Sequence, residues 1–385
     1  MRIVVAPDSF KGSVSAVETA RAMERGILRV FPQASVVKVP IGDGGEGTVE
    51  ALVAATKGEL IAAEVVGPLG NKVQAFWGML GDGDTAVVEM AAASGLTLVP
   101  EGQKDPGVTT TYGTGELIKA ALSRGVSKII VGIGGSSTND GGCGMIQALG
   151  GKFLDANGQA LPYGGLALRD LTTIDLSGMD PRLQTVELVV ACDVDNPLCG
   201  ENGASAVYGP QKGASPQMVA SLDQSLGHYA VIASKATGRS IAAQAGAGAG
   251  GGIGAGFLFF TDAVLRPGVE IVLEATSFDA LVKEAAFVMT GEGRTDFQTA
   301  FGKAPVGVGK AAQKYDVPVF CLAGGLGQGY EAVFQAGIDG VMSSVPAPMA
   351  LDECLKGGAD FIEVAADRLC RIIAGAMRVK GTKLS

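Results

Sequence analysis

Short apolar runs in this 385-residue sequence repeatedly end in glycine and in side chains that can bind a charged group. The run RIVVA, residues 2–6, leads into Asp8, Ser9 and Lys11. Four further loops of this kind contain Asp43 and Glu46; Asn139 and Asp140; Asp193, Asp195 and Asn196; and Glu292, Arg294 and Asp296. Because the carboxyl ends of parallel strands share one edge of a sheet, where α/β proteins bind ligands, these loops predict a polar site.

The segment GIGGSSTNDGG, residues 132–142, follows an apolar run and precedes a helical pattern. Its glycines allow backbone N–H groups to approach an anion closely, and hydroxyls add further donors. The same residue types also form an ordinary turn and helix cap. Spacing alone therefore leaves a phosphate site and a plain turn equally open. The residues that would contact phosphate are Gly134, Gly135, Ser136, Ser137, Thr138 and Asn139.

Two other glycine-containing segments are similar to nucleotide motifs without matching them. GAGAGGGIGAG, residues 246–256, contains G-x-G-x-x-G, but a helical pattern precedes it where a dinucleotide fingerprint needs a strand. It predicts either a loop that covers a nucleotide through Gly250 and Gly251 or a close-packed glycine turn. FGKAPVGVGKAA, residues 301–312, lacks the first glycine and the hydroxyl residue of G-x-x-x-x-G-K-[ST], so it is not a P-loop.

Paired carboxylates and basic residues suit phosphate chemistry. Asp193 and Asp195 lie two residues apart in ACDVDN, and hard oxygen ligands in that arrangement suit Mg²⁺. Arg294 offers a bidentate fork for a carboxylate or phosphate, although an internal ion pair is the alternative for it and for Glu292. Lys212, among the turn residues of YGPQKGAS, is either a phosphate contact or a surface lysine.

Composition excludes several classes of protein. The net charge is −9, and no basic run is long enough to follow a nucleic-acid backbone. No apolar stretch reaches the length of a membrane span, and the short first apolar run is not a signal peptide. The six cysteines form no C-x-x-C pair, so we expect free thiols and a cytoplasmic protein. The single histidine, His228, lies far from these loops, which excludes a catalytic triad and a multi-histidine metal site.

Apolar runs and helical patterns alternate along the chain, which predicts an α/β fold with mainly parallel sheets. The first helix is expected to begin at Ser15, which forms a capping box with Glu18. Predicted strands are RIVVA, SVVKVP, KIIVGIGG, VELVVACD, AAFVMTGEG and VPVFCLAGG. A sheet-like alternation in VVGPLGNKVQAFWGML marks a change of domain. We predict a Rossmann/flavodoxin-like parallel-sheet domain of residues 1–66 and 285–385, and an inserted α/β domain of residues 67–284.

Seven motifs, taken in order, resemble the bacterial glycerate kinase family of the 2-phosphoglycerate-forming type. They are APDSFKGS, PIGDGGEGT, GIGGSSTNDGG, ACDVDNPLCG, YGPQKGAS, GAGAGGGIGAG and TGEGRTDFQT…GKAP, and they extend from Ala6 to Pro305. The resemblance implies ATP-dependent phosphorylation of D-glycerate to 2-phosphoglycerate, with Mg²⁺, in a cleft between two α/β domains. The alternatives left open are a kinase for another small hydroxy or sugar acid, an NAD(P)-dependent oxidoreductase and a non-catalytic ligand-binding regulator.

Phosphoryl transfer to an alcohol needs an acceptor for the hydroxyl proton and a cation that bridges the phosphates. We predict that Asp193, as the more enclosed of its pair, accepts or orients the proton. Asp195 is predicted to bind Mg²⁺, together with Asp193. Asp8 and Asp296 are the alternatives for either role. We expect Lys11 and Arg294 to hold the glycerate carboxylate and the transferred phosphate, in an order that stays open.

The remaining predicted contacts divide between the two substrates. The residues expected to bind glycerate are Arg294, Ser9, Asp43, Glu46 and Glu292. Those expected to bind ATP or its phosphates are Gly134, Gly135, Ser136, Ser137, Thr138, Asn139, Lys212, Gly250 and Gly251. The oligomeric state is not determined by the sequence.

Overall fold

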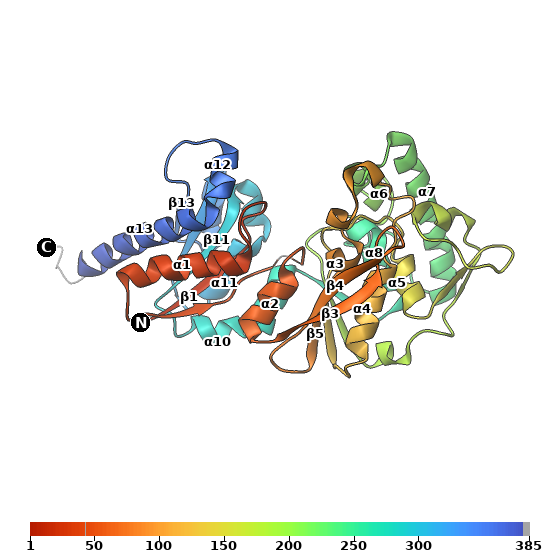
Figure 1. Cartoon of the computed structure of the whole chain (residues 1–385), viewed down its shortest axis with the longest axis horizontal. Helices are drawn as coiled ribbons and strands as arrows, with labels where there is room; N and C mark the ends of the chain where they lie inside the picture. The colour runs from red at the N-terminus through yellow and green to blue at the C-terminus, as the bar shows by residue number, and fades with distance from the viewer. Residues whose placement is uncertain (43, 380–385) are drawn as a thin grey trace. The chain divides into compact units, whose positions relative to one another are not determined.

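The computed structural model describes residues 1–42 and 44–379 of the chain (Figure 1). Contacts divide the chain into two compact units, each with its own sheet. The first unit comprises Met1–Asp43, Glu50–Lys57 and Val269–Ser385, and the second comprises Gly44–Val49 and Gly58–Gly268. Both are built from strands and helices in alternation, so the predicted α/β class is confirmed.

The first unit contains a sheet of five parallel strands. The strands are β1 (Arg2–Pro7), β2 (Ser35–Lys38), β11 (Phe287–Thr295), β12 (Val319–Leu326) and β13 (Gly340–Ser343). Their order across the sheet is β13-β12-β11-β1-β2. The chain leaves β1 through α1 (Ala16–Val30) toward β2 on one side, and leaves β11 through α11 (Ala304–Gln313) toward β12 on the other. The strand order therefore reverses between β1 and β11, and such a switch point is where doubly wound sheets bind ligands.

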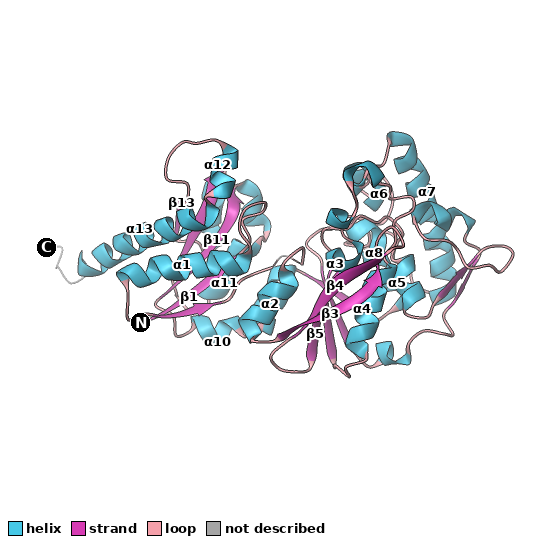
Figure 2. Ribbon diagram, in the orientation of Figure 1, coloured by secondary structure: helices cyan, strands magenta, loops and turns pink. Residues whose placement is uncertain are grey.

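Helices pack against this sheet and complete its core (Figure 2). Ile3 and Val5 alternate along β1 toward one face, where they join Met23 and Ile27 of α1 in a buried cluster. The C-terminal helix α13 (Gly358–Val379) lies along α1 and contributes to the same cluster. The other helices with residues in this unit are α2 (Thr48–Thr56), α9 (Gly268–Ala275), α10 (Phe278–Val282) and α12 (Leu351–Lys356).

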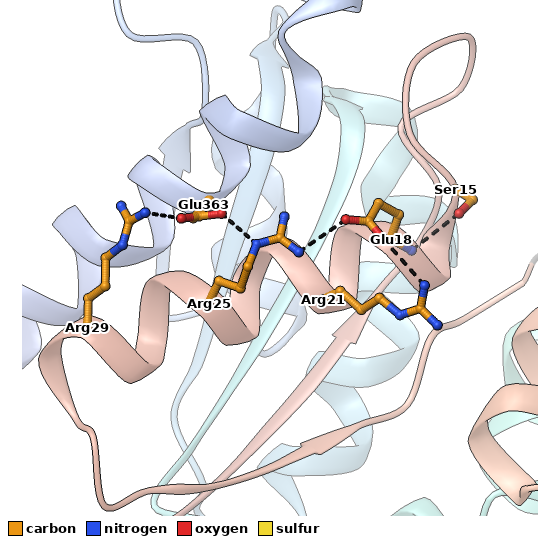
Figure 3. Close-up of polar contacts among 6 residues, drawn as sticks. All are labelled: Ser15, Glu18, Arg21, Arg25, Arg29 and Glu363. Carbon is orange, nitrogen blue, oxygen red and sulfur yellow. Dashed lines mark hydrogen bonds and ion pairs between the residues drawn. The ribbon is translucent and has the colours of Figure 1, made fainter.

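The predicted start of the first helix is confirmed, but its capping is one-sided (Figure 3). The Ser15 hydroxyl accepts a hydrogen bond from the Glu18 N–H at 3.2 Å, which satisfies one of the unpaired donors of the first turn. The Glu18 carboxylate pairs instead with Arg21 and Arg25, at 3.6 and 3.2 Å. Ion pairs along the helix therefore replace the second half of the expected capping box.

Glu363 joins α13 to the basic face of α1 (Figure 3). Its carboxylate accepts a hydrogen bond from Arg25 Nε at 2.6 Å and another from Arg29. The Glu363 side chain is only 13% exposed, whereas the two arginines are about half exposed. The hydrogen bond from Arg25 lowers the pKa of the Glu363 carboxyl despite its partial burial. This carboxylate therefore favours docking of the last helix only while it is ionised.

We expect Glu363→Gln to lower the free energy of unfolding by about 1 kcal/mol at neutral pH, because two arginines lose a charged acceptor. Since the folded-state pKa lies below that of the unfolded chain, about 4.3, the stabilisation is present above that value and is lost as the pH falls through the folded-state pKa. Urea unfolding at neutral and acidic pH measures this, with the exposed Glu331→Gln as the control. Equal unfolding midpoints for native protein and Glu363→Gln at neutral pH would contradict it.

The second unit contains a sheet of six strands in the order β10-β9-β6-β5-β4-β3. The strands are β3 (Glu59–Val66), β4 (Lys72–Met79), β5 (Thr85–Glu89), β6 (Lys128–Gly132), β9 (Glu187–Ala191) and β10 (Val264–Arg266). The last four are mutually parallel, whereas β3 and β4 form an antiparallel extension. A separate antiparallel pair consists of β7 (Lys152–Leu154) and β8 (Thr173–Asp175). The carboxyl ends of the four parallel strands thus share one edge.

The helices of the second unit pack on this sheet around a large apolar core. They are α3 (Met90–Ser94), α4 (Tyr112–Leu122), α5 (Cys143–Ala148), α6 (Ala204–Tyr208), α7 (Pro216–Thr237) and α8 (Ala249–Phe260). The contact boundaries, at 57/58 and 268/269, differ from the predicted domain limits at 66/67 and 284/285. The difference at the first limit arises because β3 pairs along its whole length with β4. None of the helices within the described ranges is both long and apolar enough to cross a membrane.

Candidate active site

The loop after β1 begins at the switch point of the first sheet. The Asp8 N–H donates to the Gly291 carbonyl of β11 at 2.8 Å, and Asp8 Oδ1 accepts from the Ser9 N–H at 2.6 Å. An antiparallel bridge between residues 10 and 14 closes the rest of the loop into a tight turn. Asp8 and Ser9 are half-buried at the end of the strand, whereas Lys11 is exposed on the turn.

Glu292 lies on β11, the neighbouring strand, and is buried, with 6% of its surface exposed. Its Oε1 accepts hydrogen bonds from the Thr295 hydroxyl at 3.0 Å and the Thr299 hydroxyl at 2.7 Å. Burial raises the pKa of the Glu292 carboxyl, and these hydroxyls and the charge of Lys303 offset only part of the rise. Two hydroxyl groups hold this carboxylate, and it forms no ion pair with a residue in the described part of the chain.

Arg294 and Asp296 follow on the same segment but differ in exposure. The Arg294 side chain is 72% exposed and that of Asp296 is 15% exposed, with Arg294 Nε 3.4 Å from Asp296 Oδ2. Asp296 Oδ1 accepts from the Gln298 N–H at 3.0 Å and caps the short 3₁₀ helix Phe297–Phe301. The Arg294 guanidinium is therefore presented to solvent and can bind an anion, whereas the Asp296 carboxylate has a local structural role.

In the second unit, the segment that begins at Gly44 runs over the carboxyl end of β6. The Gly44 carbonyl accepts from the Gly134 N–H at 3.1 Å, and a Cβ on Gly132 would lie 2.5 Å from the same oxygen. The two backbones are therefore in contact, which leaves no space for a side chain at position 132. Glu46 is exposed, and its Oε1 accepts a hydrogen bond from the Thr97 hydroxyl at 3.1 Å.

The glycine-rich loop after β6 is accessible only at its first residues. Gly134 is half-buried and Gly135 is exposed, whereas the predicted phosphate contacts at 136–139 are buried. Ser137 Oγ donates to the Ser94 carbonyl at 2.9 Å, and Asn139 Nδ2 donates to Ser205 Oγ at 2.9 Å. These two side chains shape the loop from inside. Of the six residues predicted to contact phosphate, Gly134 and Gly135 are the ones that reach the surface.

Asp140 anchors this loop to the rest of the unit. Its Oδ2 accepts from both the N–H and the hydroxyl of Thr111 at 2.9 Å and from the Gly144 N–H at 3.2 Å, and its Oδ1 accepts from the Gly142 N–H at 3.1 Å. Burial raises the pKa of the Asp140 carboxyl, and the four hydrogen bonds act in the opposite direction. The buried Tyr229 hydroxyl adds a hydrogen bond to the Gly141 carbonyl at 2.9 Å.

Lys212 is 2% exposed, so the alternative that it is a surface lysine is wrong. Its Nζ donates to the Ser136 hydroxyl at 2.7 Å and to the Thr138 carbonyl at 2.6 Å. Burial lowers the pKa of Lys212 to about 7, and the negative charge of Asp140 opposes that shift. The amine thus braces the glycine-rich loop from within, and its contact with phosphate stays a prediction.

The second glycine run, residues 246–256, packs beneath this loop. Gly250, Gly251 and Gly252 have φ values of +60°, +76° and +89°, which residues with a Cβ rarely adopt. A Cβ on Gly251 would lie 1.9 Å from the Thr138 carbonyl oxygen. Residues 246–256 therefore form a close-packed glycine turn, one of the two structures expected for this segment. A phosphate contact of Gly250 or Gly251 stays a prediction.

Asp193 and Asp195 follow β9, and both are exposed, so the enclosure expected for Asp193 is not observed. Asp193 Oδ1 accepts a hydrogen bond from the Gly268 N–H at 2.9 Å, at the first residue of α9. The sequence could not reveal this contact, because it joins two segments 75 residues apart. A carboxylate at a helix N-terminus satisfies a free N–H and interacts favourably with the helix dipole.

The carboxylates of Asp193 and Asp195, after β9, suit a Mg²⁺ ion that is also bound by substrate, and they do not form a closed metal site of protein ligands alone. Mg²⁺ takes one or two carboxylates together with substrate phosphates and water, and exposed Asp195 beside Asp193 offers that donor set. Across residues 1–42 and 44–379, no three His, Cys, Asp or Glu side chains form a group that could hold a metal. Asp43, a predicted glycerate contact, lies outside the described residues.

Glu89 is a buried carboxylate that the sequence analysis did not select. It ends β5, the strand TAVVE, and is 8% exposed. Its Oε1 accepts from the Val49 N–H at 2.6 Å in the first turn of α2. The signal that marked the other loops, an apolar run that ends in an acid, is present here as well. Like Asp193, Glu89 supplies a carboxylate near the start of a helix that connects the two units.

We expect the stability difference between native protein and Lys212→Met to depend on pH. Since burial depresses the pKa of Lys212, the folded protein holds fewer protons than the unfolded chain between pH 7 and about 10.4. The free-energy cost of burying the charged amine is thus fully present below pH 7 and falls as the pH rises. The free energy of unfolding of the native protein should therefore rise, relative to that of Lys212→Met, by at most about 1.4 kcal/mol per pH unit.

Urea unfolding of both proteins at pH 7, 8 and 9 measures this difference. Lys235→Met, at an exposed position of α7, is the matched control. Its free energy of unfolding should differ from that of the native protein by the same amount at all three pH values. A constant difference for Lys212→Met across this range would mean that the amine is not desolvated in the folded protein.

Comparison with known proteins identifies the class of this chain. The model of the glycerate kinase family matches residues 3–374. A glycerate kinase of Bacillus subtilis is 53% identical over 99% of each chain, and a glycerate 2-kinase of Escherichia coli is 51% identical over 99% of this chain and all of the relative. The crystal structure described as glycerate kinase 2 from Salmonella typhimurium LT2 superposes with a TM-score of 0.89 at 47% identity, covering 98% of this chain and 99% of the other.

The two sheets, the glycine-rich loop and the exposed cations and carboxylates at the strand ends belong to a kinase that acts on an alcohol group. More narrowly, the chain belongs to the glycerate kinase family. The sequence resemblance that indicated this family is confirmed. The NAD(P)-dependent oxidoreductase and the non-catalytic regulator, left open above, do not describe this chain.

Proposed function

We propose that this chain transfers the γ-phosphate of ATP to D-glycerate and forms 2-phosphoglycerate, with Mg²⁺ as cofactor. The observation that carries the proposal is the 51% identity, over nearly the full length of both chains, to a relative named glycerate 2-kinase. That name specifies the position phosphorylated by the relative. The six cysteines are all free, which supports a reducing, cytoplasmic location.

Two exposed cations suit the anionic groups of the reaction. Lys11 lies on the loop that follows β1, and Arg294 lies near the end of β11, the neighbouring strand of the same sheet. One of them would hold the glycerate carboxylate and the other the transferred phosphate, in an order that stays open. Arg294 is the better match for a carboxylate because its guanidinium can form two parallel hydrogen bonds. Half-buried Ser9 on the same edge would bind a glycerate hydroxyl.

The second unit would supply the nucleotide side of the reaction. Exposed Gly135 and half-buried Gly134 have no side chains, so a phosphate could approach their backbone closely. Asp195, with Asp193, would hold Mg²⁺, which neutralises charge on the phosphates when it is bound. Exposed Glu46 would contact glycerate. Under this proposal both sets of loops serve one reaction in a cleft between the units, as the family resemblance implies.

The substrate is tested with an assay that couples ADP release to a spectroscopic signal. We expect turnover with D-glycerate and Mg²⁺–ATP to exceed turnover with L-glycerate, lactate or tartronate by at least about tenfold, the low end of the discrimination that a binding pocket achieves between similar substrates. Phosphorus NMR identifies the product, because a phosphate on C2 couples to one proton and gives a doublet. A triplet would show transfer to the C3 hydroxyl, and no ADP release with any hydroxy acid would refute the proposed function.

Arg294→Lys keeps the positive charge but removes the planar fork. We expect it to lose about 1–3 kcal/mol of transition-state stabilisation, that is, about 5- to 150-fold in kcat/KM for glycerate. Arg169→Lys, at a similarly exposed position in the second unit, is the matched control. Unchanged kcat/KM for Arg294→Lys would mean that this side chain binds neither substrate.

A further inference from the structure

Glu292 occupies the centre of the first sheet at its ligand-binding edge. Pro7 of β1 pairs in register with Gly291 of β11, and Glu292 pairs with Ala323 of β12 on the other side. Asp8 follows Pro7 at the end of β1, and Glu292 lies on β11 one residue beyond Gly291. The two carboxylates therefore lie on adjacent segments at the switch point, where β11 continues beside β12 to Thr295. This is the position in the fold where a bound ligand is expected.

The environment of Glu292 differs from that of the other candidate carboxylates. Asp193 accepts a backbone N–H at the start of α9, Asp296 caps a 3₁₀ helix, and Asp8 accepts the N–H of the next residue. Hydrogen bonds from backbone N–H groups and from hydroxyls both stabilise the ionised form, so burial is what distinguishes Glu292 from these three acids. Both hydrogen bonds to Glu292 come from threonine hydroxyls, and both end on Oε1. Its Oε2 accepts none from the part of the chain that the structure describes.

A buried carboxylate of this kind is costly for a purely structural role. An ionised group away from water is unfavourable unless it is paired, and a glutamine would accept the same two hydroxyl hydrogen bonds without that cost. The charged groups near Glu292 are Lys303 at the start of α11 and Asp296 after β11, and the Cys321 thiol faces it from β12. Burial raises the pKa of the Glu292 carboxyl, and a raised pKa makes a carboxylate a better proton acceptor.

We infer that Glu292 is the proton acceptor for the substrate hydroxyl in this kinase, in place of Asp193. The inference rests on the proposed function. As the hydroxyl oxygen forms its bond to the γ-phosphorus of ATP, its O–H bond breaks and the proton passes to Glu292 Oε2. The bond from the γ-phosphorus to the β–γ bridging oxygen breaks at the same time, and ADP leaves with that electron pair. Thr295 and Thr299 are positioning residues that hold Oε1 and so orient Oε2.

The first test is Glu292→Gln, which preserves shape and the two threonine hydrogen bonds but cannot take a proton. We expect kcat to fall at least about 100-fold, with the KM for ATP nearly unchanged. Asp339→Asn is the comparison variant, because the Asp339 carboxylate accepts the Val319 N–H at 2.8 Å in the same unit, and it should retain kcat within about tenfold. If Glu292→Gln keeps near-native kcat while Asp193→Asn loses it, the inference is overturned and the original prediction for Asp193 holds.

The second test reads the protonation of Glu292 in an enzyme that keeps this residue. Thr299→Val removes a hydroxyl that favours the ionised form, so the acid limb of the kcat–pH profile should move to higher pH. Thr276→Val, which loses a hydroxyl bonded to the Val272 carbonyl in the same unit, should leave that limb in place. An unmoved limb in Thr299→Val would count against Glu292 even if Glu292→Gln failed to fold.

The two proposals fail in different ways. If the native enzyme releases no ADP with any hydroxy acid, the proposed function is refuted and the role of Glu292 falls with it. If the native enzyme is active and Glu292→Gln is equally active, the kinase assignment stands and only this inference is lost.

Discussion

The carboxyl edge of the second sheet depends on one buried carboxylate, Asp140. Its four hydrogen bonds join the glycine-rich loop after β6 to Thr111 at the start of α4 and to the first turn of α5. These bonds offset part of the cost of burying the acid, and they fix a segment, residues 132–142, in which five of eleven residues are glycine. Close backbone contacts surround the same region, between Gly132 and the Gly44 segment and between Gly251 and Thr138, and they leave no space for a Cβ on either glycine.

Charged groups in the two units fall into buried and exposed sets with different tasks. Lys212 and Glu292 are buried, and each is held by uncharged oxygen atoms or hydroxyls. Desolvation lowers the pKa of the Lys212 amine and raises that of the Glu292 carboxyl, so in both cases burial disfavours the charged form. Lys11, Arg294 and Asp195 are exposed to solvent, where their side chains can meet anionic substrates or a metal ion.

Carboxylates also organise the connections between the units. Glu89 and Asp193, both in the second unit, each accept a backbone N–H in the first turn of α2 or α9. The chain passes from one unit to the other within these same two helices. An acid that looks catalytic in sequence, at the end of an apolar strand, can thus serve to start a helix. Asp296 repeats this at the 3₁₀ helix after β11.

The sequence by itself determined the class of fold, the family and six of the thirteen strands in the described residues, namely β1, β2, β6, β9, β11 and β12. Apolar runs become parallel strands because buried strands need continuous apolar residues, and Ser15 begins its helix because capping is local in the chain. The sequence also located the polar loops at the strand ends. It could not rank their carboxylates, since burial and capping arise from contacts between distant segments, such as Asp193 with Gly268 or Lys212 with Ser136. Only the tertiary structure decided which acids start helices, which glycines touch backbone, and that Glu292 lies buried at the switch point.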